Sequence, residues 1–248
     1  MLKLSKRLQG VASLVTVGSY LADVGTDHAY IPIFLSLNNC ISGAIAMDIK
    51  EGPLRIAEGN VRNYGLAEQI ELRLSDGFAA LAPGEVEVAI LAGMGGALMI
   101  KILSEHWDVT TSLRECVLQP QAELLKLREF LLSEGFITVK EDMVMEEGKF
   151  YPMMKVIPPK QDGKANDSAD AKVDGLEREW SRVELAYGKL LLESRHPILK
   201  DLLEKELQIK TSILDHLREQ TGVQSKKRME TLQYEIELVR KGFEYYEV

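Results

Sequence analysis

The sequence predicts an α/β protein in which a parallel sheet is covered by helices on both faces, followed by a helical coiled-coil domain. Residues 20–157 alternate short β-type runs with amphipathic helical stretches, the pattern of such a sheet. Beyond residue 175, leucines recur at helical spacing. Between these regions the chain is rich in turn formers and almost free of large apolar residues. We therefore expect a first domain over 1–158, a linker or exposed loop over 159–175 and a helical domain over 176–248.

Five apolar runs in the first region are expected to form its parallel strands. They cover residues 20–24, 44–48, 70–75, 86–92 and 116–119. The helices expected between them cover residues 31–38, 53–64, 97–105 and 122–134. Pro53 suits a first helical turn because its missing N–H would have no partner there. Two further runs, 136–144 and 150–157, lie on either side of Gly148 and are expected to pair antiparallel.

The region after residue 175 reads as helix almost throughout, with an apolar stripe formed by leucines and Ile213. His196-Pro197 should interrupt this helix, because proline disfavours a helical residue before it. Thr221-Gly222 is expected to turn the chain, and 226–248 should form the last helix. Helices with such stripes are expected to pack as an antiparallel coiled-coil arm.

Bulk composition narrows the class of protein. Apolar residues make up 46% of the 248 residues and charged residues 27%, which is ordinary for a soluble globular protein. Its apolar runs are too short to cross a bilayer, and residues 1–15 do not form a signal peptide, so we expect no membrane partner. Cys40 and Cys116 lie in apolar settings without nearby metal ligands, so we expect free thiols, no metal and a cytoplasmic location. A net charge of −8 disfavours wholesale binding to nucleic acid but allows a local basic face.

The segment after the first strand carries the clearest chemical signal. Asp23, Gly25, Thr26, Asp27 and His28 form a short turn between a strand and a helix, as in a nucleotide-cofactor loop. The glycine fingerprint that binds a pyrophosphate is absent, and the acids stand where phosphates would lie. S-Adenosylmethionine has no phosphate and carries an ammonium and a sulfonium, so acids suit it. Alternatively, this is a strand-end turn with a capping aspartate.

Acids also follow the second and third strands. Asp48 precedes Ile49 at the end of the second strand, where a carboxylate can accept both ribose hydroxyls of an adenosyl cofactor. Asp76-Gly77 ends the third strand, where a carboxylate can accept from an adenine amino group. Each acid alone is equally a helix cap or a turn residue. Three acids at successive strand ends, where ligands of open α/β sheets bind, favour a class I Rossmann-like methyltransferase domain.

The ends of the fourth and fifth strands suggest how a substrate is held. Gly93 and Met94 begin a glycine-rich turn in place of the Asn/Asp-Pro-Pro-aromatic motif of many amino-methylating enzymes. This turn would leave an open floor for a flat base; alternatively, it is a tight strand-to-helix turn that needs glycine. The fifth strand ends in Gln119-Pro120-Gln121, and the amides of the two glutamines can both donate and accept toward a base edge.

Several motifs together resemble one family. ADVGTDHAYIP, AMDI, LSDG, LAGMGG and LQPQ occur in this order, with LSKRL near the start and YGKLLLESRHPIL in the helical region. Together they resemble the bacterial tRNA adenine-N1-methyltransferases that modify adenine 22 in the tRNA core, and the resemblance covers nearly the whole chain. It implies S-adenosylmethionine as cofactor and tRNA as substrate. It places these residues around the cofactor: Asp23, Gly25, Asp27, Asp48, Asp76, Gly77 and Gly93.

That activity makes mechanistic demands on the site. Adenine N1 has an in-plane lone pair, so positioning is expected to dominate catalysis. Asp27 would favour the positive charge of the product base, and Gly93 and Met94 would lie beside the methyl group. N1 lies on the pairing edge, so the base must be unpaired or extruded, and Tyr30 or His28 could stack on it. Packing at the helix start is the alternative role of both rings.

Basic residues indicate how an acidic chain could hold RNA. Arg7 lies near the expected cofactor domain entrance with Lys3 and Lys6, and Lys226, Lys227 and Arg228 lie on the arm. We expect these residues to contact RNA phosphates. Alternatively, they belong to a solvent-exposed face, as runs of charged residues on coiled coils usually do.

Three other functions remain open at this stage. They are a methyltransferase of another small molecule or protein, a non-catalytic regulatory module that binds S-adenosylmethionine, and a nucleotide dehydrogenase. The dehydrogenase fits worst, because the phosphate-binding glycines are missing. The sequence leaves the oligomeric state open, with a monomer favoured.

Overall fold

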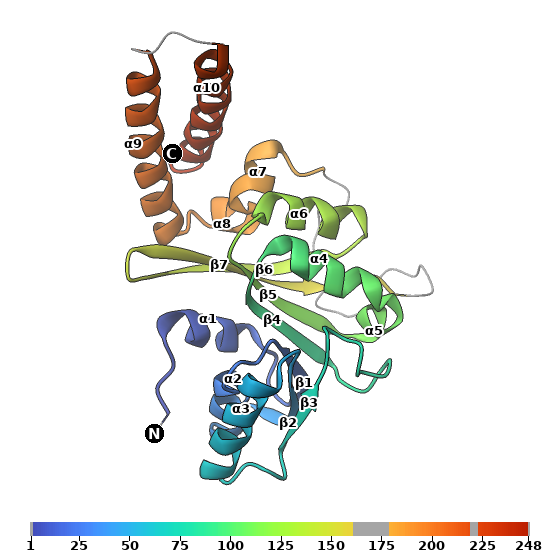
Figure 1. Ribbon diagram of the computed structural model, residues 1–248. Helices are drawn as coiled ribbons and strands as arrows, with labels where there is room; N and C mark the ends of the chain where they lie inside the picture. The colour runs from blue at the N-terminus through green and yellow to red at the C-terminus, as the bar shows by residue number, and fades with distance from the viewer. Residues whose placement is uncertain (1, 161–178, 219–222, 248) are drawn as a thin grey trace. The chain divides into compact units, whose positions relative to one another are not determined.

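The computed structural model describes residues 2–160, 179–218 and 223–247. It divides into two compact units, an N-terminal unit Met1–Leu176 and a C-terminal unit Glu177–Val248 (Figure 1). Residues 161–175 of the predicted linker and the predicted turn at Thr221-Gly222 lie outside the described residues. The domain boundaries expected from the sequence therefore stay a prediction.

The N-terminal unit is built on a seven-stranded sheet with the order β3-β2-β1-β4-β5-β7-β6. Strands β1 to β5 run parallel, and β7 pairs antiparallel with both β5 and β6. This arrangement confirms the expected class I methyltransferase layout of a parallel sheet closed by an antiparallel pair. The strands are β1 (Ser19–Val24), β2 (Ile41–Asp48), β3 (Ile70–Leu74), β4 (Val88–Met94), β5 (Glu115–Pro120), β6 (Ile137–Glu146) and β7 (Lys149–Ile157).

Helices cover both faces of the sheet (Figure 1). On one face lie α1 (Lys6–Leu14), α2 (Tyr30–Leu37) and α3 (Glu51–Asn63). On the other lie α4 (Gly96–Glu105), α5 (Trp107–Ser112) and α6 (Leu124–Ser133). Strand residues alternate between the two cores: Leu21 packs with the first set of helices and Ala22 with the second. Both faces are therefore buried, which explains why the strands read as nearly continuous apolar runs.

The sequence did not predict α1 and α5, and it placed the fourth strand two residues early, at 86–92 rather than Val88–Met94. In α1 the glycine at position 10 lowers helix propensity. It is there because a Cβ at Gly10 would lie 2.9 Å from Sδ of Met153 in β7. The helix packs too closely on the sheet for a larger residue. Ser5 caps it, its Oγ accepting from the Leu8 N–H at 3.3 Å.

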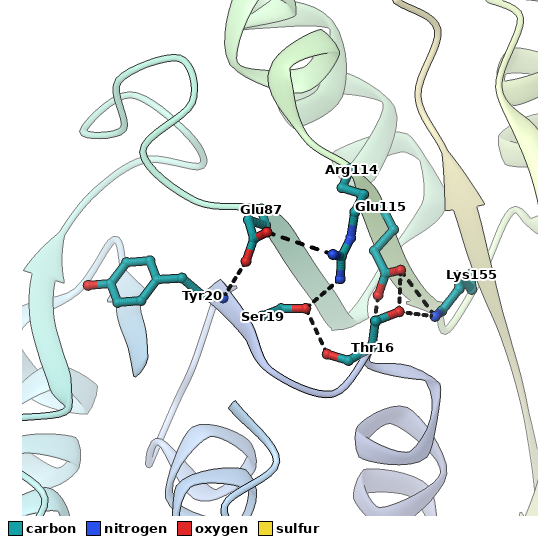
Figure 2. A network of polar contacts seen from close by, with 7 residues as sticks. All are labelled: Thr16, Ser19, Tyr20, Glu87, Arg114, Glu115 and Lys155. Atoms are coloured by element: carbon teal, nitrogen blue, oxygen red, sulfur yellow. Dashed lines mark hydrogen bonds and ion pairs between the residues drawn. The ribbon is translucent and has the colours of Figure 1, made fainter. Parts of the chain in front are cut away.

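A polar network joins the amino-terminal ends of several strands (Figure 2). The buried Glu115 carboxylate accepts from the Thr16 N–H at 2.9 Å, from the Thr16 hydroxyl at 2.6 Å and from Lys155 Nζ at 3.1 Å. Arg114 Nη2 donates to the Ser19 hydroxyl at 2.7 Å. The network therefore ties the segment before β1 to β5 and β7, at the edge of the sheet opposite the ends of β1, β2 and β4.

The C-terminal unit is helical, as the leucine spacing predicts. It contains α7 (Arg182–Tyr187), α8 (Lys189–Glu193), α9 (Pro197–Arg218) and α10 (Val223–Glu244). The expected break at His196-Pro197 is present, because Pro197 is the first residue of α9. The two long helices pack antiparallel around Leu214, Leu232 and Ile236. A coiled-coil supercoil in this pair stays a prediction.

Candidate active site

A cavity of about 280 Å³, here called the strand-end cavity, opens at the carboxyl ends of β1 and β4. It brings together many of the predicted site residues, and α1 and the segment after β5 complete its wall. Its lining residues are Arg7, Leu8, Asp23, Gly25, Thr26, Asp27, His28, Tyr30, Ile31, Ala92, Gly93 and Gln121. Leu8, Ile31 and Ala92 were not predicted, and the alternation of β4 is the only sequence signal for Ala92.

The loop between β1 and α2 has an unusual backbone. Gly25 has φ +73°, and the N–H groups of Gly25 and Thr26 both donate to the Met47 carbonyl, at 2.9 and 2.8 Å. Asp27 and Ala29 also adopt left-handed conformations, with φ of 55° and 58°. Such values are uncommon for residues other than glycine and are held by surrounding structure. Neighbouring segments therefore fix the direction in which this loop presents its side chains.

Asp23 is the buried acid of the site, with 4% of its surface exposed. Its Oδ2 accepts from the Thr26 hydroxyl at 2.6 Å. Burial raises the pKa of Asp23 to about 6, against the lowering effect of the Thr26 hydrogen bond, and the charges of Asp48 and Asp27 add to the rise. Within the described residues none of these three carboxylates pairs with a lysine or arginine. Arg7 also lines the cavity, but its guanidinium is held by Gln119 and forms no ion pair with these acids within the described residues.

We expect the raised pKa of Asp23 to appear in the pH dependence of folding. The pKa of Asp23 is about 6 in the folded state and 3.8 for a free aspartate, so the folded state holds a proton that the unfolded state releases between these values. This contribution therefore destabilises the fold as pH rises from 4 to 6. Asp23→Asn removes it. The variant should gain stability relative to wild type, on the order of 1–3 kcal/mol, between pH 4.5 and 7.5. Urea midpoints at both pH values measure this difference, and a pH-independent difference would contradict it.

Asp48 and Asp76 do not line the strand-end cavity but stand at neighbouring strand ends. One oxygen of Asp48 accepts from the Lys50 N–H at 2.9 Å, and its backbone carbonyl accepts from the Ser75 N–H. Asp76 is exposed directly after β3, and Ile49 is exposed after β2. Gly77 has φ +56° and packs against Ile102. These residues therefore extend the row of acids from the cavity along the sheet edge.

The carboxyl end of β4 forms the floor of the cavity. Gly93 has φ +81°, and a Cβ there would lie 3.2 Å from Arg7 Nη1 and 3.7 Å from Gln121 Nε2. Met94 lies outside the cavity lining, but its Cε would be 3.3 Å from a Cβ at Gly25, so it packs on the loop after β1. Glycine at 93 therefore leaves the space that a side chain would fill.

Gln119 is not placed as the sequence suggested. Its side chain is fully buried, its Oε1 accepts from Arg7 Nη1 at 3.0 Å, and its Nε2 donates to the Pro120 carbonyl at 3.1 Å. Both ends of the amide are thus engaged within the protein, and Gln121 is the glutamine that reaches the cavity. Arg7 also lies over the Tyr151 ring, 5.8 Å from its centroid. Gln119 therefore orients Arg7 rather than facing a ligand.

His28 and Tyr30 lie side by side at the mouth of the cavity. Their ring centroids are 5.4 Å apart, with 44° between the planes. His28 Nε2 lies 3.5 Å from Asp27 Oδ1, and its Nδ1 is buried without a hydrogen-bond partner in the described part of the chain. An unsatisfied buried atom of this kind in a cavity wall is commonly satisfied by a ligand or water.

The donor set of the cavity fits one of the ligands that the sequence suggests. The carboxylates of Asp23 and Asp27, which pair with no lysine or arginine among the described residues, fit a cationic, phosphate-free adenosyl cofactor and would repel a pyrophosphate. Among the described residues no group of three His, Cys, Asp or Glu side chains is arranged to hold a metal ion. Burial raises the pKa of Cys116, so this thiol is not a nucleophile. No helix in the described ranges is long and apolar enough to cross a membrane.

Known proteins share this fold. A methyltransferase-domain family matches residues 4–154. A tRNA (adenine(22)-N(1))-methyltransferase of Bacillus subtilis is 33% identical over 245 residues, covering 98% of each chain. This chain belongs to that family. The solved B. subtilis m1A22 tRNA methyltransferase TrmK superposes on it with a TM-score of 0.81 at 32% identity, covering 98% of this chain and 99% of that one.

A second solved member of this structural group was determined with the cofactor bound. Streptococcus pneumoniae Sp1610, in complex with S-adenosyl-L-methionine, has a TM-score of 0.81 at 31% identity and covers 97% of this chain and 99% of its own. The comparisons extend over both units of the tRNA (adenine(22)-N(1))-methyltransferase fold. Lys226, Lys227 and Arg228 lie on α10 in the C-terminal unit, where all three are exposed and Arg228 pairs with Glu235 at 3.4 Å.

Proposed function

We propose that this chain transfers a methyl group from S-adenosylmethionine to N1 of adenine 22 in tRNA. The observation that carries the proposal is the strand-end cavity itself. In it the unpaired acids of the β1 loop face the open glycine floor after β4, within a chain of the tRNA (adenine(22)-N(1))-methyltransferase family. The acids suit a cationic cofactor, and the floor leaves room for a flat base.

The cofactor would be held along the row of acids. Asp48 would accept from the ribose hydroxyls, Asp76 from the adenine amino group, and Asp23 would attract the ammonium. When bound, S-adenosylmethionine supplies an electrophilic methyl group on a sulfonium. The carboxylates would orient it, and its positive charge would favour the ionised form of Asp23, whose pKa is raised by burial.

The protein's task toward the adenine is positioning. N1 carries an in-plane lone pair at neutral pH, so no general base is required. The methylated base is a cation, and Asp27 at the cavity wall would favour that charge. Tyr30 would contact the face of the extruded base, Gly93 would leave space beneath it, and Gln121 would meet its edge. Met94 would act indirectly, by packing on the loop that carries Asp27.

The C-terminal unit would supply part of the RNA affinity. Lys226, Lys227 and Arg228 are exposed on α10, where they can contact phosphates, and Arg7 would contribute at the cavity. Replacing the three α10 residues by glutamine should flatten the salt dependence of tRNA binding, and an unchanged salt slope would refute this part. Because we propose tRNA as the substrate, we place the enzyme in the cytoplasm. We also propose that it is a monomer.

The direct test incubates the protein with unmodified tRNA transcripts and S-adenosylmethionine labelled in its methyl group. Reverse transcription should then stop opposite adenine 22, because an N1-methyl group blocks base pairing. Asp48→Ala should weaken cofactor binding by about ten- to a hundredfold, the loss of about 1.5–3 kcal/mol of charged hydrogen bonding. The KM for S-adenosylmethionine, measured by varying the cofactor at a fixed tRNA concentration, reports this loss.

Glu51→Ala is the matched control, because Glu51 is an exposed acid close to Asp48 whose one ion pair among the described residues is with the exposed Arg55. It should retain wild-type kinetics. Labelled tRNA without a reverse-transcription stop would support a methyltransferase but reject methylation at N1. Absence of label on every tRNA, despite cofactor binding, would favour a different substrate or a regulatory role.

A further inference from the structure

A second cavity of about 440 Å³, here called the N-terminal cavity, adjoins the strand-end cavity. We propose that it binds a second nucleotide of the RNA strand that carries the target adenine, with Tyr64 stacking on its base and Lys3 contacting its phosphate. This inference rests on the proposed function and adds a substrate subsite to it. The cavity lies between the segment before α1 and the end of α3, and its wall includes Lys3, Ser5, Leu8, Tyr30, Asn60 and Tyr64.

The two cavities share a wall. Leu8 and Tyr30 line both cavities. An RNA strand whose base enters the strand-end cavity would therefore pass Tyr30 before it reaches the N-terminal cavity. None of the three acids that are proposed to hold the cofactor, Asp23, Asp48 and Asp76, lines the N-terminal cavity, so the proposed cofactor position lies outside it. Its volume is within the range of ligand sites, which is about 300–1,000 Å³. The continuity with the proposed base pocket therefore points to the neighbouring nucleotide as its occupant.

Of the two tyrosines of this cavity, Tyr30 contacts the His28 ring, and Tyr64 has no aromatic or polar side-chain contact within the described residues. Tyr30 and Tyr64 are each 38% exposed, and neither hydroxyl has a hydrogen-bond partner among the described residues. The Tyr64 N–H donates to the Asn60 carbonyl at 3.1 Å at the end of α3, but any residue with an N–H can do this. Exposed aromatic faces beside a base pocket suit stacking, which is worth about 1–3 kcal/mol per base.

The charge near the cavity suits a phosphate. The segment 2–8 carries Lys3, Lys6 and Arg7 and no acid, in a chain whose net charge is −8. Neither Lys3 nor Lys6 forms an ion pair through its ammonium group within the described residues, whereas Arg7 is held by Gln119. Free cations against this background are the groups that bind a phosphate backbone.

Asn60 connects the two cavities through the backbone. Its Nδ2 donates to the His28 carbonyl at 3.0 Å, between the two left-handed residues Asp27 and Ala29. A ligand in the N-terminal cavity would therefore press on the residue that supports the β1 loop. The hydrogen bond from Asn60 to the His28 carbonyl would therefore link occupancy of the second subsite to the geometry of the first, in addition to the shared wall.

The experiment measures tRNA binding and methylation for Tyr64→Ala and Tyr64→Phe, with Tyr234→Ala as control because Tyr234 is an exposed tyrosine on α10. Binding is measured with unmodified tRNA transcript and enzyme saturated with S-adenosylhomocysteine. Tyr64→Ala should weaken tRNA binding and raise the tRNA KM by about 5- to 100-fold, while Tyr64→Phe and Tyr234→Ala stay near wild type. The affinity for S-adenosylhomocysteine should be unchanged, which also shows that the variant is folded. Lys3→Gln should reduce the salt slope of tRNA binding by about one.

Two outcomes would overturn the subsite. One is a Tyr64→Ala variant with wild-type tRNA binding and KM, in an enzyme that methylates tRNA. The other is a Tyr64→Phe variant as impaired as Tyr64→Ala, because stacking does not need the hydroxyl. Failure of the proposed function looks different: the wild-type enzyme would bind S-adenosylhomocysteine but neither bind nor methylate tRNA, and the subsite would fall with it.

Discussion

Replacing Arg128 by methionine is expected to destabilise the N-terminal unit by about 3–5 kcal/mol. Arg128 in α6 and Glu141 in β6 are buried, with 2% and 0% of their side chains exposed, and Nη2 lies 2.9 Å from Oε1. Arg128 Nε also donates to the same oxygen at 3.1 Å. Removing the guanidinium leaves a buried carboxylate without its main counter-charge. In urea unfolding followed by circular dichroism, the midpoint should fall by at least about 1 M.

Two further variants separate the buried charge from the loss of packing. Arg62→Met breaks an exposed pair with Glu58 of the same helix, and its midpoint should change little, because exposed pairs are worth less than about 1 kcal/mol. The double variant Arg128→Met/Glu141→Leu should recover part of the loss, since both charges leave together. An Arg128→Met midpoint no lower than that of Arg62→Met would show that the pair contributes nothing.

The largest effect on turnover is expected for Gly93→Ala. At φ +81° an alanine costs about 1–2 kcal/mol of backbone strain, and its Cβ would lie 3.2 Å from Arg7 Nη1 on the floor of the strand-end cavity. The floor, Arg7 or the bound base must then shift. At 3.2 Å the neighbour must shift by a few tenths of an ångström. Because a misplacement of about 1 Å in a positioning site can cost about a hundredfold, we expect turnover to fall by about tenfold. Steady-state methylation of tRNA at saturating cofactor measures the loss.

Gly95→Ala is the matched control in the same turn. Gly95 has φ −72°, and a Cβ there would meet no atom within 4 Å. Its kcat should stay within a few-fold of wild type. Equal losses in the two variants would mean that the whole turn, rather than the space above Gly93, limits the reaction.

The sheet and its row of acids could be predicted because their signals are local. Strand runs, the Asp23–Asp27 loop and the acids after β2 and β3 depend only on periodicity and on where a strand ends. Their meeting at one edge then follows from the parallel topology. Asp48 and Asp76 are at the predicted strand ends for this reason, although neither lines the strand-end cavity.

The parts of the site that could not be predicted depend on contacts between distant residues. Gln119 and Gln121 are chemically alike, and only the hydrogen bond from Arg7, 112 residues away, decides that Gln119 is used internally. The same holds for α1, whose Gly10 is explained by Met153 across the sheet rather than by helix propensity. The N-terminal cavity joins the segment before α1 to Tyr64, and no local pattern marks that meeting.

The polar network of Figure 2 lies at the edge of the sheet opposite the proposed chemistry. Substitutions of Thr16, Glu115 or Lys155 should therefore change how much folded enzyme a cell accumulates, while each folded molecule keeps its turnover. Substitutions at Asp27 should mainly change turnover, whereas Gly93→Ala should lower turnover and also cost about 1–2 kcal/mol of backbone strain. If a library of variants were sorted separately for yield and for specific activity, the two sets should differ in their position along the strands. Stabilising substitutions could then be combined at the amino-terminal ends of the strands without changing substrate choice at the carboxyl ends.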